Sequence, residues 1–187
     1  MFSIKKLFSL MLSLTLVACA SMGDGSKAEQ QQEIITMKDT VLNQLFANKP
    51  DTRSQINSAA GYAVFSNANI NLIFMAAGTG YGVVKSNNSA KYTYMNMAEG
   101  GIGLGLGVKD YRIVMVFHSA QEMNDFVNQG WSFGGNVDAA AKAGDKGGSV
   151  EGEMYYGDVT VYTFTENGLA LQATIKGTKF WQDSKLN

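Results

Sequence analysis

The chain contains only one cysteine, one histidine and one proline among its 187 residues. A zinc site takes several Cys or His ligands, so Cys19 and His118 cannot form a conventional one. A single cysteine also leaves no partner for an intramolecular disulfide. Basic and acidic residues number 15 and 16 and form no basic patch in the sequence, which argues against binding to nucleic acid.

Nucleotide-binding motifs are missing as well. The sequence has no Gly-x-x-x-x-Gly-Lys-Ser/Thr loop and no Gly-x-Gly-x-x-Gly fingerprint. Five carboxylates in or around the second set of expected strands do not follow EF-hand spacing. These are Asp138, Asp145, Glu151, Glu153 and Asp158. We therefore expect no metal ion and no cofactor.

The first 18 residues have the layout of a bacterial export signal. Lys5 and Lys6 precede an apolar run, 7–17, that is too short to span a bilayer as a helix. The run ends in Leu-Val-Ala-Cys (16–19), which matches the lipobox of lipoproteins. We expect cleavage before Cys19 and attachment of fatty acyl chains such as palmitate, which together anchor a protein stably. An ordinary secreted protein with a cysteine at its cleavage site is the alternative.

Ala20 follows Cys19 at the position where inner-membrane lipoproteins usually carry aspartate. The sequence therefore predicts anchoring at the periplasmic face of the bacterial outer membrane. It divides into a signal peptide (1–18), an acylated N-terminus and tether (19–32) and a single domain (33–187). Without Lys5 and Lys6 the chain carries a formal net charge of −3, from 13 basic and 16 acidic residues.

The first element expected in the domain region is a helix. From about residue 27 to 48 the apolar residues recur at helical spacing, and Pro50 ends the pattern. Its amphipathic part, 33–48, has few basic residues near the apolar face, only Lys38 and Lys49. We expect packing on a core rather than insertion into a membrane.

A short helix, 52–60, then leads into segments with the two-residue period of strands. The strand candidates are 70–86, 90–97, 100–108, 111–118, 132–143, 150–164 and 168–181. Ser119 and Glu122 form a capping box that starts a helix, and Gly130 ends it. This order predicts an α+β fold. Its glycine-rich sheet is mainly antiparallel and barrel-like, with an N-terminal amphipathic helix and one helix inserted between two strand sets.

Glycine is abundant, with 21 residues, and occupies alternate positions in two segments. Gly101, Gly103, Gly105 and Gly107 lie on one face of the expected strand 100–108, which we expect to pair with 111–117. Such a bare face admits another backbone, an aromatic ring or a ligand. We favour packing within the protein. A ligand-lined groove is the alternative, and it makes these four glycines the candidate ligand-binding residues. Gly78, Gly80 and Gly82 repeat the arrangement.

His118, beside Ser119 at a strand end, is the one candidate general base. A Ser–His device needs an orienting carboxylate and an oxyanion hole. Ser119 is already assigned as a helix cap, and Glu122 is its capping partner. We therefore predict no catalytic residues and no enzymatic activity.

The order of several motifs resembles the SYLF-domain family in its bacterial lipoprotein branch. The motifs are GYAVF (61–65), GTGYGVV (78–84), GGIGLGLGVKDYRIVMVF (100–117), GWSFGGNVDAAAKAGDKGG (130–148) and YTFTENGLALQATIKGTKF (162–180). The resemblance covers roughly 35–181 and implies a lipid-binding module. Eukaryotic members of the family bind phosphoinositide membranes, and some touch actin. Basic residues for phosphoinositides are sparse here, so only the fold and a generic lipid-binding role are implied.

Two hypotheses about the function remain. The first is a non-enzymatic envelope lipoprotein whose periplasmic domain binds membrane lipid or another apolar ligand. The alternative is a structural or interaction lipoprotein that binds a protein partner and uses lipid only as its anchor. Its contacts would be aromatic residues expected to be exposed, namely Tyr92, Tyr94, Tyr155, Tyr156 and Trp181.

Overall fold

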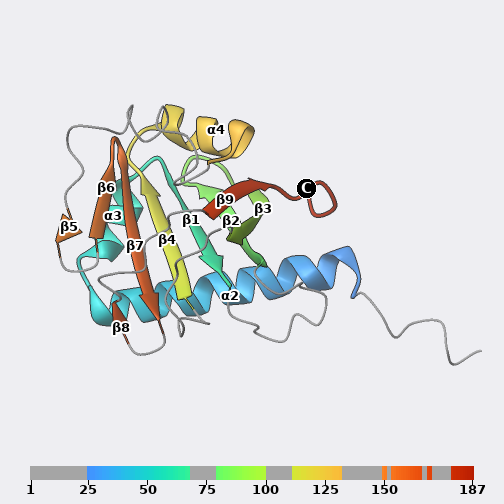
Figure 1. Cartoon of the computed structure of the whole chain (residues 1–187), viewed down its shortest axis with the longest axis horizontal. Helices are drawn as coiled ribbons and strands as arrows, with labels where there is room; N and C mark the ends of the chain where they lie inside the picture. The colour runs from blue at the N-terminus through green and yellow to red at the C-terminus, as the bar shows by residue number, and fades with distance from the viewer. Residues whose placement is uncertain are drawn as a thin grey trace, which may run out of the picture.

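The structure is a computed structural model, and it describes most of the domain region. The residues described are 25–67, 79–99, 111–131, 149–150, 153–165, 168–169 and 178–187. Figure 1 shows a long helix, α2, crossing one side of a curled sheet and a shorter helix, α4, at one end of the strands.

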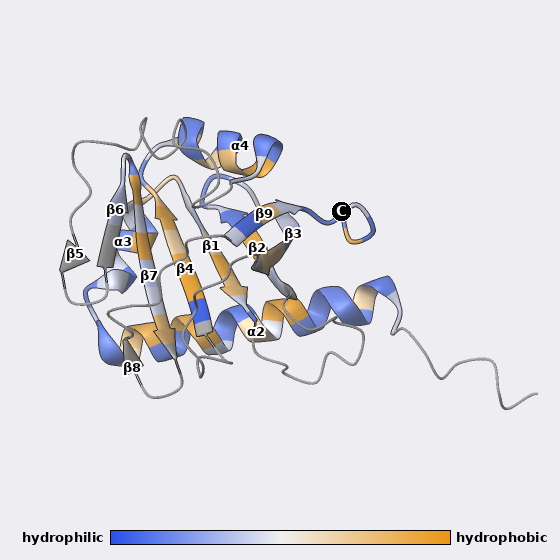
Figure 2. Ribbon diagram, in the orientation of Figure 1, coloured by the Kyte–Doolittle hydropathy of each residue, from blue (hydrophilic) through white to orange (hydrophobic). Residues whose placement is uncertain are grey.

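Helix α2 (Lys27–Asn48) begins and ends where the sequence predicts. Ser26 Oγ accepts the N–H of Glu29, and the Ser26 N–H donates to the Glu29 carboxylate at 2.6 Å, which completes a capping box. Hydrophobic and hydrophilic stretches alternate along α2 (Figure 2), and its buried apolar side chains belong to a core cluster shared with the sheet. The buried ones are Ile34, Met37, Val41, Leu42 and Leu45. The prediction that this helix packs on the core is therefore confirmed.

Helix α3 (Thr52–Ser58) leads directly into the sheet, and α4 (Ala120–Gln129) separates two groups of strands. The strands are β1 (Gly61–Ser66), β2 (Thr79–Ser86), β3 (Tyr92–Glu99), β4 (Tyr111–Phe117), β5 (Ser149–Val150), β6 (Glu153–Tyr156), β7 (Val159–Thr165), β8 (Gly168–Leu169) and β9 (Thr178–Gln182). Within the described residues they form one antiparallel sheet in the order β5-β6-β7-β4-β1-β2-β3-β9, and β8 pairs with β7. The predicted α+β fold with a curled, barrel-like antiparallel sheet is confirmed.

The predicted pairing of 100–108 with 111–117 is wrong. Strand β4 pairs with β1 along one edge, over residues 112–117, and with β7 along the other, over residues 111–117. Neither edge is left for another strand. The pairing rested on a short turn sequence, which favours hairpins between neighbours. Burial decides otherwise: residues 112–117 are at most 4% exposed, so this strand needs neighbours on both sides and cover on both faces.

The expected strand 150–164 is not continuous: Val150 ends β5, and β6 and β7 follow as separate strands. The boundary between β6 and β7 is a hairpin turn. Gly157 and Asp158 form its two-residue loop, with Tyr156 opposite Val159. Gly157 has φ +56°, a conformation that glycine adopts without strain. Gly-Asp between two apolar runs predicts a hairpin, so the sequence itself contains the signal that divides this segment.

The sheet has a core on each face. Helices α2 and α3 cover one face, where Val64, Val83 and Val114 lie. On the other face α4 covers a cluster rich in Phe and Met. The rings of Phe65, Phe117, Phe126, Trp131 and Phe180 contact one another there, with centroids 4.7–6.2 Å apart. All six residues of β1 are buried because both faces are covered.

The C-terminal residues join the start of α2 to the sheet. The Tyr94 N–H donates to Asn187 Oδ1 at 2.9 Å, and Asn187 Nδ2 donates to the Tyr94 carbonyl at 2.8 Å. From α2, Lys27 Nζ donates to the Asn187 carbonyl (2.9 Å) and Gln31 Nε2 to the Leu186 carbonyl (2.7 Å). We call residues 183–187 the C-terminal clip. It places the beginning of α2 beside the residues that follow β9.

Two glycines with positive φ give a matched test of this packing. Gly130 (φ +68°) ends α4, and a Cβ there would collide with the Phe180 carbonyl, whereas a Cβ at Gly157 would meet nothing within 4 Å. We expect Gly157→Ala to lower the free energy of unfolding by about 1–2 kcal/mol through backbone strain alone. Gly130→Ala should lower it by about 2 kcal/mol more, because of overpacking. Chemical denaturation measures both, and equal losses would contradict the packing of α4 on β9.

Candidate functional site

The residues that the sequence assigns to lipidation and ligand binding lie outside the described residues. They are Cys19, Gly101, Gly103, Gly105 and Gly107. Acylation of the cysteine and a ligand-lined glycine face therefore stay predictions. The domain boundaries also stay predictions, although α2 begins at Lys27, within the segment assigned to the tether.

The second alternating glycine segment shows how such a face is used. A Cβ at Gly82 would collide with the Phe65 ring and the Val64 carbonyl. One at Gly80 would collide with Met97 and the Ser66 carbonyl. These two glycines therefore leave room for the protein's own side chains and backbone. For β2 the packing interpretation is confirmed, and Gly78 lies outside the described residues.

His118 is bound to structural partners. Its Nε2 lies 2.8 Å from Thr160 Oγ1, and its backbone N–H donates to the Asp158 carbonyl. Ser119 Oγ accepts the Glu122 N–H at 3.1 Å, as expected for the cap of α4. The described contacts of His118 thus place it against a buried threonine, and Ser119 serves the helix.

Metal ligands do not gather in the described part of the chain, where no three His, Cys, Asp or Glu side chains lie together. Asp138, Asp145 and Glu151 fall outside it, and Asp158 lies exposed in the β6–β7 turn. Among the helices of the described ranges, none has both the length and the apolar composition required to cross a membrane.

The aromatic residues expected to be exposed fall into three groups: exposed, buried and partly buried. Tyr155 and Trp181 are each 37% exposed, as predicted. Tyr94 is buried at 8%, so that prediction is wrong. Its side chain points to the core beneath α2, a consequence of the β2–β3 register that opposes Tyr94 to the buried Val83. Tyr92 and Tyr156 are partly buried against the two cores.

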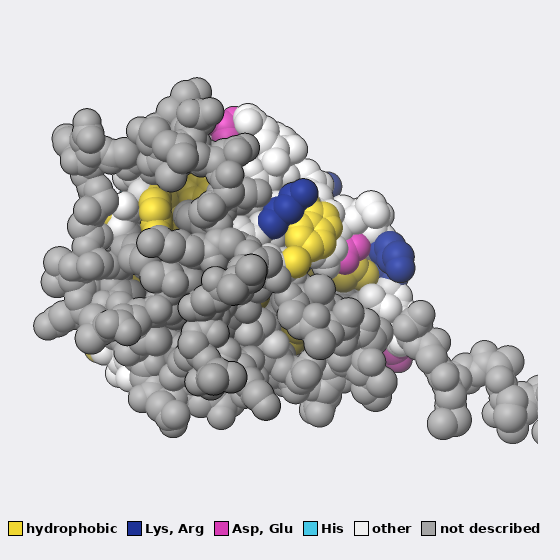
Figure 3. All heavy atoms as spheres, in the orientation of Figure 1, with side chains coloured by type: hydrophobic (Ala, Val, Ile, Leu, Met, Phe, Trp, Pro, Cys, Tyr) yellow, Lys and Arg dark blue, Asp and Glu magenta, His cyan; other side chains and the backbone are white. Residues whose placement is uncertain are grey.

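Trp181 belongs to a surface formed by the outer side of β9. Thr178 and Phe180 are buried, whereas Lys179 and Trp181, which alternate with them, are exposed. We call Lys179 and Trp181 the β9 surface. Figure 3 shows hydrophobic side chains beside Lys or Arg side chains on the face over β9. The sequence pattern Lys-x-Trp alone does not predict this exposed surface. The exposure of Lys179 and Trp181 follows only from the burial of Phe180 on the opposite side of the strand.

Further lysines lie at the same end of the molecule. Lys27 contacts the C-terminal clip, and Lys185 is part of it. The two carboxylates here are engaged by backbone N–H groups: Glu29 accepts from Ser26, and Asp183 accepts from Lys185 and Leu186 at 2.8 and 3.1 Å. This hydrogen bonding lowers the pKa of Glu29, so its carboxylate stays ionised.

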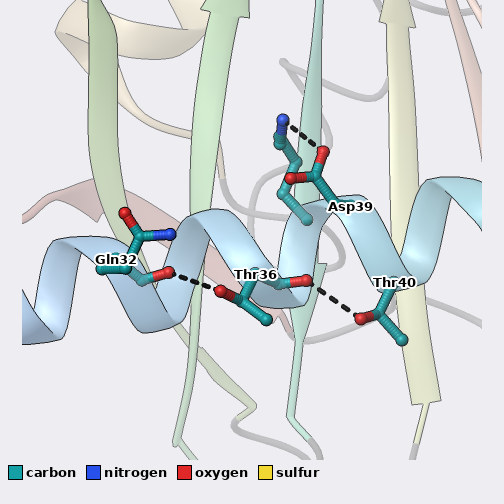
Figure 4. A network of polar contacts seen from close by, with 5 residues as sticks. Gln32, Thr36, Asp39 and Thr40 are labelled. Atoms are coloured by element: carbon teal, nitrogen blue, oxygen red, sulfur yellow. Dashed lines mark hydrogen bonds and ion pairs between the residues drawn. The ribbon is translucent and has the colours of Figure 1, made fainter.

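Lys38 of α2 forms a polar cluster with Asp39 and the Tyr92 ring. Figure 4 shows the ion pair of Asp39 together with the hydrogen bonds that Thr36 and Thr40 make to carbonyls one turn earlier in α2. Lys38, only 6% exposed, pairs with Asp39 at 2.7 Å, and its ammonium lies 5.4 Å from the centre of the Tyr92 ring. Lys85 contacts the same ring at 5.6 Å. Burial alone lowers the pKa of Lys38, but the hydrogen bond to Asp39 and the nearby negative charges outweigh it, and the pKa is raised. The cluster therefore holds a charged lysine beneath α2 and fixes the helix on the sheet.

A buried phenol, Tyr81, lies on the same face of the sheet. Burial, and next the negative charge of Glu33, raise the pKa of Tyr81 to about 12, while Arg112 opposes the shift. Arg112 is itself only 4% exposed. The phenol stays neutral at physiological pH, so it provides no nucleophile there.

Comparisons with known proteins point to the family that the sequence motifs resemble. A family model described as "Ysc84: Las17-binding protein actin regulator" matches residues 98–187, nearly half of the chain. This region of the chain, residues 98–187, belongs to the Ysc84, or SYLF-domain, family. The chain is also similar to beta cell expansion factor A of Aeromonas veronii, with 34% identity over 161 residues. That alignment covers 84% of this chain and 59% of the relative, so the chain spans less than two thirds of the relative's length.

The matched range of the Ysc84 family contains the β9 surface, the C-terminal clip and His118, but not α2. The resemblance predicted from the motifs is thus confirmed. What the family description and the relative's name say about binding or activity belongs to those proteins.

The buried Tyr81 predicts a loss of stability in alkali. Between pH 10 and 12 the unfolded chain releases the phenolic proton while the folded domain keeps it, because burial raises the pKa of Tyr81. The free energy of unfolding should therefore fall as pH rises, on the order of 2 kcal/mol from this group. The raised pKa of Lys38 acts in the same direction. Denaturation of Tyr81→Phe at several pH values should show a shallower fall, and parallel profiles would contradict the assignment.

His118 allows a test of its structural role. We expect His118→Ala to lower the free energy of unfolding by about 1 kcal/mol, through loss of the contact with Thr160 Oγ1. Binding of the purified protein to vesicles should not change. A cellular phenotype lost at normal protein levels and normal stability would instead show that the imidazole has a chemical role.

Proposed function

We propose that the chain is a non-enzymatic lipoprotein of the bacterial envelope, with a domain that binds lipid or another apolar ligand. Acylated Cys19 holds it at the periplasmic face of the outer membrane. The observation that carries the proposal is the short distance along the chain from Cys19 to the helix cap Ser26. Seven residue steps extend to at most about 25 Å, so the domain lies next to the bilayer that holds its anchor.

The surface chemistry of the domain supports this function. An exposed tryptophan beside a lysine is suited to the boundary between lipid headgroups and acyl chains, because the indole has an apolar body and a polar N–H. The β9 surface presents this combination. The hydroxyl that His118 contacts, Thr160 Oγ1, is fully buried, and the described contacts of His118 include no orienting carboxylate. This fits a binding protein better than an enzyme.

A protein partner is the second candidate. It is favoured by the exposure of Tyr155 and Trp181, because aromatic residues are enriched in protein interfaces. The description of the matching family model names a Las17-binding protein and actin regulator, which also points to protein interaction. In this case the acyl chains would only hold the domain in place.

Cell fractionation and vesicle flotation test the preferred function. We expect the full chain in the outer-membrane fraction, and Cys19→Ser in the soluble fraction or retained with its signal peptide. The purified domain without the acyl chains should float with vesicles of phosphatidylethanolamine and phosphatidylglycerol. Failure to bind bacterial phospholipid and lipopolysaccharide alike would contradict the function. Crosslinking in intact cells that recovers the same protein repeatedly would then support the second candidate.

A further inference from the structure

We propose that the β9 surface, Lys179 and Trp181, is the face with which the domain lies on the bilayer that holds its anchor. This orientation rests on the proposed function. Trp181 is 37% exposed, although its neighbours on the strand, Phe180 and Thr178, are buried at 1%. A large aromatic side chain left on the outer side of a strand, next to a lysine, has the composition of an interfacial membrane contact.

The position of the tether selects this face. The tether enters the domain at Gly25, directly before the cap of α2. Lys27 of α2 contacts Asn187, and Asn187 contacts both backbone groups of Tyr94 on β3. Asn96 lies two residues after Tyr94 on β3, and Trp181 of β9 lies opposite Asn96. The anchor therefore pulls on the end of the domain that carries the β9 surface, and Figure 1 shows the start of α2 and the C-terminus on the same side.

The charges at this end complement an anionic bilayer. Lys27, Lys179 and Lys185 carry positive charge. The ionised carboxylates of Glu29 and Asp183 lie at the same end, and each accepts backbone N–H groups that offset part of its negative charge. Lysine side chains beside an interfacial tryptophan bring their ammonium groups to the level of the lipid phosphates. The occupant is therefore the lipid surface of the anchoring leaflet, through indole insertion and lysine–phosphate contacts.

Tyr155 provides the matched control. It is exposed to the same extent as Trp181, but it lies on β6, and five strands separate β6 from β9 in the sheet. A domain held on the bilayer by β9 keeps β6 away from it. A membrane contact that depended only on exposed aromatic residues would use both.

Tryptophan fluorescence in proteoliposomes tests the orientation in the acylated full-length protein. The chain has two tryptophans, and Trp131 is partly buried in the aromatic cluster. In the Trp131→Phe variant, emission comes from Trp181 alone. We expect phosphatidylethanolamine and phosphatidylglycerol vesicles with brominated acyl chains to quench it at least twofold relative to unbrominated vesicles. The Trp181→Phe variant, which reports on Trp131, should show little quenching.

Binding of the domain without acyl chains gives the second measurement. Trp181→Ala and Lys179→Glu should each weaken binding to the same vesicles about tenfold, and added salt should weaken the wild type but affect Lys179→Glu less. Tyr155→Ala should bind as the wild type does. Circular dichroism confirms folding of each variant, and the quenching measurement stands if Trp181→Ala fails to fold.

The outcomes separate this proposal from the function on which it rests. Flotation without quenching of Trp181, or equal losses from Trp181→Ala and Tyr155→Ala, overturns the orientation and leaves lipid binding intact. Absence of flotation overturns lipid binding itself. A protein crosslink that Trp181→Ala abolishes, without any quenching in vesicles, shows that the β9 surface is a protein interface and also overturns the proposal.

Discussion

Burial of both faces of the β1–β4 pair is the constraint on which the rest of the structure depends. Every residue of β1, and residues 112–117 of β4, are buried. An antiparallel sheet commonly leaves one face to solvent, but this pair needs cover on both. Helix α2 covers one face, and α4 with the aromatic cluster covers the other. Polar residues occur where the pair ends, at Ser66 and Arg112.

The same constraint explains why β2 contains glycine. Phe65 of β1 and Met97 of β3 lie beside β2 on the aromatic face, and each occupies the volume that a side chain at Gly82 or Gly80 would fill. Close packing in protein interiors leaves little room for both. Glycine on one strand and large side chains on its neighbours are therefore two parts of one arrangement. Such a face excludes ligands where the neighbours are large, which narrows where an apolar ligand could enter the domain.

Local signals in the sequence predict the helices well and the sheet less well. Helix ends are set by neighbouring residues, such as Pro50, Ser119 and Gly130, so spacing and capping signals in the sequence locate them. Strand pairing depends on residues distant in the chain. The position of β4 between β1 and β7 follows from total burial, which no single segment encodes. The candidate site divides in the same way: the lipobox is a local motif, whereas the β9 surface requires the burial of Phe180 and the position of the C-terminal clip.

The C-terminal clip also determines how the domain responds to force along its tether. In the proposed anchored form, a pull on Cys19 arrives at the start of α2, where Lys27 and Gln31 donate hydrogen bonds to residues 187 and 186. These bonds lead to Tyr94 in β3, so the load passes into the sheet instead of unwinding α2 from its end. Helix α2 and strand β3 then resist the pulling force together. In that form, the C-terminal clip would transmit the load from the proposed anchor to the sheet.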